Sequence, residues 1–395
     1  MRGVIVAAGL AATCALPAVA AGTVAPHVSQ QAVRSWQVLA PGWSKSDKEA
    51  GRVDDVLRVG HRLYVAGNFT VMANHAGRAV TRWRLAAVRP RSGVLTPFAP
   101  RIDGRVYALA ATRRLLIAGG AFSSVNGRPR RNLAAFSLRT GRLSRRLSNL
   151  GVRGTVTALA ATRSAVYVGG MFSSVGGRPR GDLAKLVVRR GRVRLARRWA
   201  PRANGGVRDI VVAARRVIAG GTFTAVNGRS QQHIAALSPR HGRLQTWADH
   251  PPYDILDLAV DRRAVYAAEA GPGGTALKFR TRNGRQRWYY KTDGNVQAVT
   301  VVRGFPVFGM HGDYVAPRRN RSMREHGTSH RIQRHKIFML SYRGTLQRWN
   351  PGLTSTAGVL GVWALAAGGG NVYVGGDFTA VHGVVQQRLA ILPHR

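Results

Sequence analysis

The stretch Leu115-Leu116-Ile117-Ala118-Gly119-Gly120-Ala121-Phe122 decides the fold, because its end recurs along the whole chain. Further copies of the Gly-Gly-x-Phe phrase stand at residues 169–172, 220–223 and 375–378, with variants at 66–69 and 311–314. A degenerate copy at residues 265–269 fills the one long gap. The copies are spaced by about 50 residues, and a fixed period of this size is typical of a repeat architecture. The chain therefore holds seven copies of one unit.

Each copy contains four short apolar or β-branched pieces separated by Gly, Asn and Pro, which is typical of antiparallel strands. In the second copy the first piece is residues 106–110, the stretch quoted above is the second, and residues 133–136 are the third. The fourth piece often carries tryptophan, as at Trp199, Trp247, Trp288 and Trp349. This pattern predicts an all-β, seven-bladed β-propeller of four-stranded antiparallel blades. The glycine pair would let neighbouring backbones approach closely and adopt unusual dihedral angles.

The last copy stops after its third strand, so its blade needs a strand from elsewhere. The segment Ser35-Trp36-Gln37-Val38-Leu39-Ala40-Pro41 resembles a fourth strand, and we expect it to close the last blade. Residues 1–20 have the charged start, apolar core and Ala18-Val19-Ala20 site of a secretory signal peptide. We assign residues 21–33 to a disordered leader and residues 34–395 to the propeller, with a basic insertion at about residues 315–335.

The charge balance is extreme, since 61 Lys and Arg stand against 16 Asp and Glu, a formal net charge of +45. Such a positive field favours polyanionic partners. The single cysteine, Cys14, lies in the signal segment, so the mature chain has no disulfide and no cysteine ligand or nucleophile. We expect a monomeric protein that is secreted, extracellular or associated with the cell envelope, with no metal, no cofactor and no transmembrane segment.

The phrase V-G-G-x-F-T-x-V-x-G followed by L-A resembles a family of secreted bacterial β-propeller repeats of unknown function. Residues 375–383 with Leu389-Ala390, and residues 119–127 with Leu133-Ala134, carry it here. The likeness implies a propeller and says little of function, because the repeated residues are structural. The stretch from Ala236-Leu237 through Gly242-Arg243-Leu244 to Trp247 is more distantly similar to quinoprotein repeats, which dock tryptophan between blades. We expect shared blade packing there and no quinone site.

Three carboxylates share one position of the inner strands, at which the other four copies have alanine. They are Asp55, Asp209 and Asp257. One interpretation is a set of side chains in the central channel that binds a cation or water. The interpretation that we favour is that each accepts backbone N–H groups, or pairs with a neighbour such as Arg208, and thereby fixes a strand.

Two sets of arginines are candidates for binding anions. The first stands at matching loop positions of successive copies: Arg128, Arg130, Arg131, Arg178, Arg180 and Arg229. The second lies in the basic insertion: Arg318, Arg319 and Arg321. The insertion should project from the face formed by the loops between second and third strands. It either grips phosphates or sulfates or is a solvated loop, and the sequence leaves both open.

The leading hypothesis is a non-catalytic binding module for an anionic envelope or extracellular polymer, without sequence-specific nucleic-acid recognition. One alternative is a carbohydrate-active hydrolase or lyase. Its carboxylates would come from the loops, at Asp103, Asp182, Asp249, Asp254 and Asp293. Another alternative is a scaffold whose faces bind a protein partner. The sequence offers no catalytic motif that would identify a catalytic residue.

Overall fold

The computed structural model describes residues 26–39, 50–147, 150–189, 192–247, 249–321, 331–355 and 361–394. The predicted signal peptide and the first part of the predicted leader, residues 1–25, lie outside the described residues. So do Ala40 and Pro41 of the predicted closing strand and residues 322–330 of the basic insertion.

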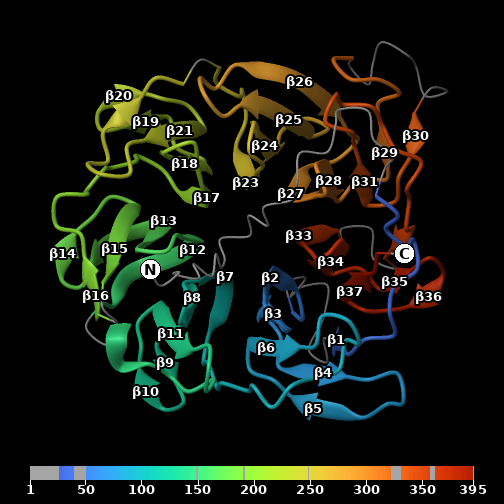
Figure 1. Cartoon of the computed structure of the whole chain (residues 1–395), viewed down its shortest axis with the longest axis horizontal. Helices are drawn as coiled ribbons and strands as arrows, with labels where there is room; N and C mark the ends of the chain where they lie inside the picture. The colour runs from blue at the N-terminus through green and yellow to red at the C-terminus, as the bar shows by residue number, and fades with distance from the viewer. Residues whose placement is uncertain are drawn as a thin grey trace, which may run out of the picture.

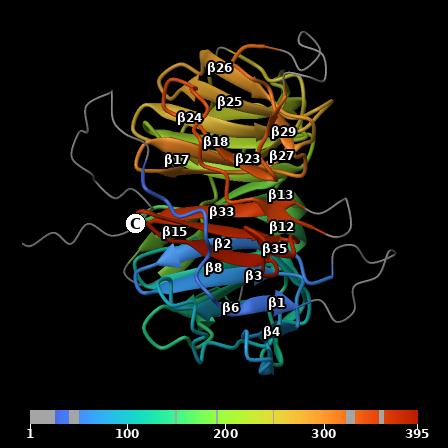
Figure 2. The same cartoon turned by 90° about the vertical axis from the view of Figure 1, so that its right-hand side faces the viewer.

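The sheets form a ring around a central axis (Figure 1), and the strands run roughly along this axis (Figure 2). Within the described ranges, seven sheets share the order first strand, second strand, third strand. The first strands lie nearest the axis and are β2 (Val53–Val59), β7 (Arg105–Ala111), β12 (Val152–Ala161), β17 (Val207–Ala213), β23 (Ile255–Val260), β27 (Val296–Val302) and β33 (Val362–Gly368). The second strands are β3 (Arg62–Gly67), β8 (Leu115–Ala121), β13 (Ala165–Val175), β18 (Arg216–Gly221), β24 (Ala264–Glu269), β28 (Phe305–Met310) and β34 (Asn371–Gly376). The third strands are β6 (Leu85–Val88), β11 (Leu133–Ser137), β15 (Leu183–Arg189), β21 (Ile234–Leu237), β25 (Thr275–Arg280), β31 (Ile337–Met339) and β37 (Leu389–Leu392).

A fourth strand is formed in three of these sheets, as β16 (Arg192–Leu195), β22 (Leu244–Gln245) and β26 (Gln286–Lys291). In three others the corresponding segment makes one isolated antiparallel bridge to the third strand, at Leu95, Leu143 and Leu346. Of the four tryptophans that we placed on fourth strands, only Trp288 lies in one. Trp199 and Trp247 follow the end of a fourth strand, and Trp349 stands where no fourth strand forms. The rings of these three are buried between sheets.

Short hairpins lie at the outer edge of the ring, between the second and third strands (Figure 1). They are β4 (Val71–Ala73) with β5 (Ala79–Thr81), β9 (Ser124–Val125) with β10 (Arg128–Pro129), β14 (Arg178–Pro179) with the end of β13, β19 (Ala225–Val226) with β20 (Arg229–Ser230), β29 (Tyr314–Val315) with β30 (Ile332–Gln333), and β35 (Ala380–Val381) with β36 (Val384–Val385). Two further strands, β1 (Gln37–Leu39) and β32 (Leu353–Thr354), extend the β4–β5 and β35–β36 hairpins. One 3-10 turn, η1 (Arg145–Leu147), completes the elements of the described residues.

The N-terminal segment lies beside the last sheet, but the residues that do so precede those that we expected. Val28 bridges His394, the Ser29 N–H donates to the Pro393 carbonyl at 2.7 Å, and the Val33 N–H donates to that of Ile391 at 2.9 Å. Strand β1, in the middle of the predicted closing strand, pairs with β4 of the first repeat and also meets the last repeat, where the Val38 N–H donates to the Gln387 carbonyl at 3.2 Å. Residues 28–33, which we assigned to the leader, thus occupy the edge of β37.

The glycine pairs pack the ring together, as we expected. A Cβ on Gly119 would lie 2.4 Å from Val156 Cγ1 of the next first strand, and one on Gly375 would lie 2.5 Å from Val53, which joins the last sheet to the first. The second glycine of each pair faces its own first strand, where a Cβ on Gly120 would lie 2.0 Å from the Arg105 carbonyl oxygen. These glycines have ordinary negative φ angles, so close approach explains them and unusual dihedral angles do not.

Tryptophans dock between successive sheets. Trp199 is 1% exposed, packs on Tyr167 with ring centroids 5.3 Å apart, and donates from Nε1 to the Ser238 carbonyl at 3.0 Å. Trp349 donates in the same way to the Ser29 carbonyl at 3.3 Å, where the N-terminal segment lies beside the last sheet. These contacts are the blade packing that the likeness to quinoprotein repeats implied.

Candidate functional site

The three inner-strand carboxylates hold neighbouring first strands together. Asp55 Oδ2 accepts the Leu109 N–H at 2.6 Å, Asp209 Oδ2 accepts that of Leu258 at 3.0 Å, and Asp257 Oδ2 accepts that of Val299 at 2.6 Å. Each bond joins one first strand to the next around the axis. This is the structural role that we favoured over a cation site. In the part of the chain that the structure describes, no group of three or more His, Cys, Asp or Glu is placed to hold a metal ion.

These aspartates have raised pKa values. Burial raises the pKa of Asp55 to about 7 and that of Asp209 to about 7. Burial, and then the charge of Asp209, raise the pKa of Asp257 well above its ordinary value. Asp209 and Asp257 both accept the Leu258 N–H, at 3.0 and 2.9 Å, so the two carboxyl groups lie close together and this pair holds a proton more tightly than isolated carboxyl groups would.

The loop carboxylates proposed for hydrolysis also bind backbone groups or neighbours. Asp103 accepts the Ser123 and Ser124 N–H groups at 2.9 and 3.0 Å, and Asn204 does the same for Thr224 and Ala225 in another repeat. The remaining four bind as follows: Asp182 accepts the Phe172 N–H, Asp249 that of Gln286, Asp293 that of Tyr314, and Asp254 contacts His233. Because Asn204 accepts backbone N–H groups as Asp103 does, this structural role explains the loop carboxylate without a catalytic function.

The arginines of the first set divide into two kinds. Arg130 and Arg180 are each 8% exposed, and burial lowers the pKa of both. Arg180 donates to the carbonyls of Pro179, Ala196 and Arg197, so its guanidinium ties a hairpin to the outer edge of its sheet. The exposed arginines lie on the outer hairpins or next to them: Arg128, Arg131, Arg178 and Arg229. These four are the members of the set whose side chains face solvent.

We expected the basic insertion to project from a face. Its residues 322–330 lie outside the described residues, and its first part follows the edge of the fifth sheet. Residues 316–320 run along β26, where the Ala316 N–H donates to the Lys291 carbonyl at 2.9 Å and the Asn320 N–H donates to that of Tyr289 at 2.9 Å. An outer strand leaves backbone groups unpaired, and this segment covers them. The path carries Arg319 to the crevice between the β23 and β27 sheets. Arg318 and Arg321 are exposed beside it.

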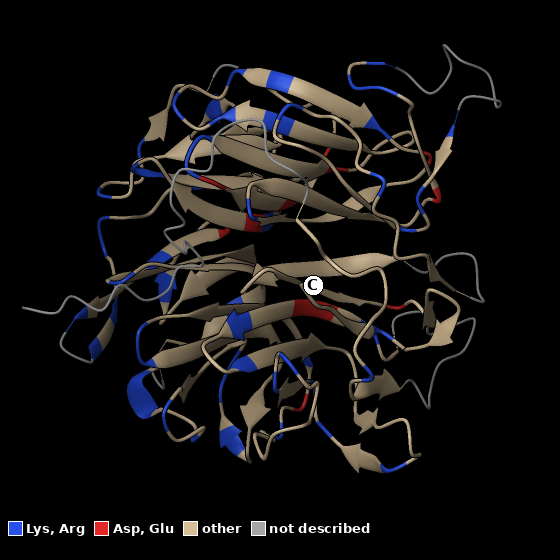
Figure 3. Ribbon diagram, turned by 45° about the vertical axis from the view of Figure 1, so that its right-hand side comes forward, with Lys and Arg blue, Asp and Glu red and all other residues tan. Residues whose placement is uncertain are grey.

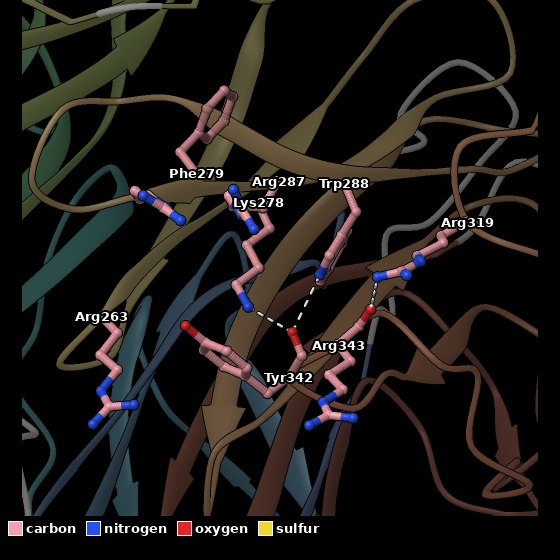
Figure 4. A pocket seen from close by; sticks show the side chains of 9 residues that line it. Arg263, Lys278, Phe279, Arg287, Trp288, Arg319, Tyr342 and Arg343 are labelled. Carbon is pink, nitrogen blue, oxygen red and sulfur yellow. Dashed lines mark hydrogen bonds between the residues drawn. The ribbon is translucent and has the colours of Figure 1, made fainter. Parts of the chain in front are cut away.

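Arg319 lines a small cationic cavity, which we name the Lys278 pocket (Figure 4). Its volume is about 190 Å³. The lining is Arg263, Lys278, Phe279, Arg280, Arg287, Trp288, Arg319, Tyr342 and Arg343, with six cations and no carboxylate. Elsewhere the basic residues are spread over turns on many sides of the molecule (Figure 3). This pocket is where they converge from three separate segments of the chain.

Lys278 forms the floor of the pocket. Only 3% of it is exposed, and its Nζ donates to the Tyr342 carbonyl at 2.5 Å, which also accepts Trp288 Nε1 at 3.3 Å. Arg319 donates to the Arg343 carbonyl in the same turn (Figure 4). The aromatic rings of Tyr266 and Trp288 lie 5.7 and 6.0 Å from Nζ. The ammonium is thus held by one carbonyl and surrounded by rings and guanidinium groups.

The electrostatics of the pocket favour an anion. The pKa of Lys278 is lowered to about 7, chiefly by burial; the charge of Asp261 raises it, and those of Arg287 and Arg319 lower it. Asp261 lies next to the pocket, where it accepts the Tyr266 hydroxyl at 3.0 Å and the N–H groups of Arg263 and Ala264. A cation that is destabilised by its neighbours gains from any negative charge that enters.

Part of this arrangement repeats elsewhere in the ring. Lys185 donates from Nζ to the Pro239 carbonyl at 2.6 Å, and Arg62 donates from Nη1 to that of Leu138 at 3.1 Å, in both cases at the matching turn of the next sheet. A second cavity, of about 350 Å³, lies at the Arg62 position and is lined partly by Pro97, Phe98 and Pro100. The contact from cation to turn is therefore structural, and the surrounding arginines distinguish the Lys278 pocket.

Of the predicted anion-binding residues, only Arg319 belongs to this pocket. The sequence did not reveal the others, because they come from the turn before β24, from the third and fourth strands β25 and β26, and from a turn of the next sheet. One signal could have found Lys278. It stands between Leu277 and Phe279 on a buried strand, and lysine is rare in this arginine-rich chain. In the described ranges, no helix is long and apolar enough to cross a membrane.

Comparison with known proteins identifies the fold. No protein-family model and no curated protein matches the chain. The WD40 β-propeller domain of Doa1 matches with a TM-score of 0.55 and 13% identity, over 92% of this chain and 97% of that one. The computationally designed protein Ika8 matches with a TM-score of 0.51 and 13% identity, over 92% and 99%. The extracellular domain of a one-component system from B. thetaiotaomicron matches with a TM-score of 0.52 and 10% identity, over 92% of this chain and 40% of that one. At these identities the likeness shows a β-propeller fold alone.

Proposed function

We propose that this protein is a secreted, non-catalytic binding module that holds anionic groups of an extracellular or envelope polymer in the Lys278 pocket. We further propose that its fold is a seven-bladed propeller of four-stranded blades, closed by the N-terminal segment. The observation that carries the binding proposal is the convergence of six cationic side chains on one cavity without a carboxylate in its lining. Asp261 beside the pocket offsets part of this charge, and the positive charge that remains favours the entry of an anion.

The size of the cavity favours a single anionic group of a longer chain. About 190 Å³ is below the usual range for a drug-sized ligand, about 300–1,000 Å³, and is ample for one phosphate or sulfate. Guanidinium groups bind such oxyanions with two parallel hydrogen bonds. Arg263, Arg287 and Arg343 are exposed at the rim, where they can reach the ligand. A polymer would then continue over the basic surface on either side.

The test is binding of two polymers that separate phosphate from sulfate, long-chain polyphosphate and heparin. Calorimetric titration at several salt concentrations would compare the wild type with Arg287→Gln/Arg319→Gln/Arg343→Gln. We expect the triple variant to bind at least tenfold more weakly, with a salt dependence reduced by about one ion for each arginine replaced.

The matched control is Arg189→Gln/Arg192→Gln/Arg194→Gln, which removes the same charge from β15 and β16, far from the pocket. Only the pocket variant should lose affinity. Equal losses in both variants would show that attraction is spread over the surface. Binding that is absent, or insensitive to salt, would refute an anion-binding role altogether.

Affinity should also depend on pH. Because the pKa of Lys278 is lowered to about 7, this side chain is partly neutral at pH 8 and protonated at pH 6. A bound anion favours the protonated form, so binding takes up a proton and tightens as pH falls between 8 and 6. Titrations in two buffers with different ionisation enthalpies would measure this uptake. Lys185→Met serves as the control for Lys278→Met, because Lys185 makes the same structural contact.

A further inference from the structure

Each of the seven first strands has a β-bulge at the same place, and the bulged residues form what we name the axial ring. They are Asp54, Tyr107, Thr157, Arg208, Leu256, Gln297 and Trp363. The residue before each is valine or isoleucine, and the residue after each is alanine or aspartate. The ring itself consists of seven different amino acids. Packing fixes the flanking residues, so the variation marks a position that packing does not control.

The axial ring lies at one end of the axis. Each bulged residue is the second or third residue of its strand, except in β12, where it is the sixth. Because the strands surround the axis and run in the same sense, the bulges meet at the same end (Figure 1). A bulge redirects a side chain away from the regular alternation of a strand, and bulges are common beside binding sites. The fold therefore gathers chemically different side chains from every sheet at one place.

One side of the ring is a stack of rings and guanidinium groups. Arg52 Cζ lies 4.1 Å from the centre of the Trp363 ring, and Arg105 Cζ lies 4.7 Å from that of Tyr107. Asp54 lies between the two arginines, at 2.9 Å from Arg52 Nε and 2.6 Å from Arg105 Nε. The Trp363 and Tyr107 rings are partly exposed, while only 7% of the Asp54 side chain is accessible. The stack holds both aromatic rings in fixed positions at the end of the axis.

The charges of this stack balance. Trp363 Nε1 donates to Asp377 at 3.1 Å, and burial raises the pKa of this carboxyl to about 6, so it is ionised at neutral pH. Asp54 and Asp377 then compensate Arg52 and Arg105. A polyanion finds no uncompensated cationic cluster on this side of the ring, in contrast to the Lys278 pocket. The ligand suited to the axial ring is thus not a polyanion.

Two further members of the ring offer polar groups, Gln297 on β27 next to the strand of Trp363, and Arg208 on β17 across the ring. Gln297 is 6% exposed, and its Oε1 has no hydrogen-bond partner among the described residues. This oxygen lies beside Gly361, two residues before Trp363, where a Cβ on the glycine would approach it to 2.8 Å. Arg208 is exposed and can donate. A buried acceptor without a partner is costly, and a hydroxyl group from a ligand would satisfy it.

We propose that the axial ring is a second binding site, for a neutral saccharide unit. A sugar ring has an apolar face of C–H groups that packs on Trp363 and Tyr107. Its hydroxyl groups both donate and accept, which fits the Gln297 oxygen and the Arg208 guanidinium. This site lies at the axis, whereas the Lys278 pocket lies in a crevice between two outer strands and a turn. The two proposals are independent.

The test is a glycan array probed with the mature chain in 0.5 M salt, which suppresses binding of polyanions. The strongest neutral glycan would then be titrated against Trp363→Ala and Gln297→Leu. We expect binding to weaken on the order of tenfold for Trp363→Ala, and several-fold for Gln297→Leu, which keeps the size of the side chain. Circular dichroism and thermal denaturation would show that both variants fold.

The matched control is Trp83→Ala. Trp83 is also partly exposed and has a guanidinium over its ring, that of Arg101 at 5.2 Å, but it precedes β6 and lies outside the first strands. Affinity that survives Trp363→Ala and Gln297→Leu, or falls equally in Trp83→Ala, would overturn the proposal. So would an array on which no neutral glycan binds, or binding that is lost in the Arg287→Gln/Arg319→Gln/Arg343→Gln variant.

Discussion

Replacing Asp55 by asparagine should stabilise the protein at high pH, although it removes a charge that lies beside a hydrogen-bond donor. Asp55 accepts the Leu109 N–H, and asparagine keeps an oxygen in the same place. The folded-state pKa is raised to about 7 from an ordinary value of 3.8, chiefly by burial. Between these values the folded chain holds a proton that the unfolded chain has lost. The free energy of unfolding therefore falls as pH rises from 4 to 8.

The magnitude follows from the size of the pKa change. A rise from 3.8 to about 7 corresponds to roughly 4 kcal/mol, at about 1.4 kcal/mol for each pH unit. The side chain is only half-buried, so solvent screens part of this effect and we expect about 2 kcal/mol. Asp55→Asn should therefore gain about 2 kcal/mol relative to the wild type at pH 8, and close to nothing at pH 4.

The assay is chemical denaturation followed by tryptophan fluorescence, at pH values from 4 to 8. The difference between variant and wild type isolates Asp55 from the other titrating groups. Asp55→Ala is the companion variant, because it also removes the acceptor of the Leu109 N–H and should lose about 1–3 kcal/mol relative to Asp55→Asn. A difference that does not change with pH, or an asparagine variant less stable than the wild type at pH 8, would refute the reasoning.

Three further predictions concern the same ring of sheets. Asp209→Asn and Asp257→Asn should each raise the free energy of unfolding at pH 8. The double variant should gain less than the sum of the two single gains, because removing one charge relieves the other carboxylate. Chemical denaturation of the wild type, the two single variants and the double variant measures this coupling. Trp199→Phe should lower the free energy of unfolding by about 1–3 kcal/mol, since the hydrogen bond to the Ser238 carbonyl is removed and a void is left. A loss below about 0.5 kcal/mol would argue that the docked tryptophan is not a stabilising contact. Gly376→Ala should lower the melting temperature strongly, because its Cβ would lie 2.2 Å from a carbonyl oxygen of the neighbouring first strand, and unchanged melting would contradict that packing.

The sequence was sufficient for the features that a repeat makes visible. The glycine pairs, the first, second and third strands, and the tryptophans between sheets all stand at equivalent positions in several copies, so each copy supports the others. The structural role of Asp55 could also be predicted, since four copies have alanine at the same position and therefore do not need a carboxylate there. The comparison within one chain replaces the information that related sequences would give.

The features that the sequence did not predict are those that occur once. The position of residues 28–33 beside β37 depends on how the two ends of the chain meet, and no other copy offers a parallel. The insertion follows β26 because that strand has an open edge, which only the arrangement of the fifth sheet reveals. The bulge that creates the axial ring is different, since it recurs in all seven first strands, yet it leaves no mark in the sequence beyond a variable residue between two restricted ones.

Rare residue types carry the structural information in this chain. It has 61 basic residues, of which six are lysines: Lys45, Lys48, Lys185, Lys278, Lys291 and Lys336. The four described lysines are buried or half-buried, and each donates to a carbonyl or hydroxyl of the fold. A compact ammonium group fits where a planar guanidinium does not, so lysine persists at positions where geometry demands it.

The same argument separates the Lys278 pocket from the equivalent position of Lys185. If lysine marks structure, then Lys185 and Lys278 should be equivalent, and their contacts to the next turn are. Burial is the main cause that lowers the pKa of both lysines, and they differ in the charges around them, because Asp261, Arg287 and Arg319 also act on the pKa of Lys278. Placing arginines around a structural lysine costs stability, and neither packing nor the repeat requires them there. An anion that occupies the pocket offsets that cost, which is why the bound protein should be measurably more stable than the free one.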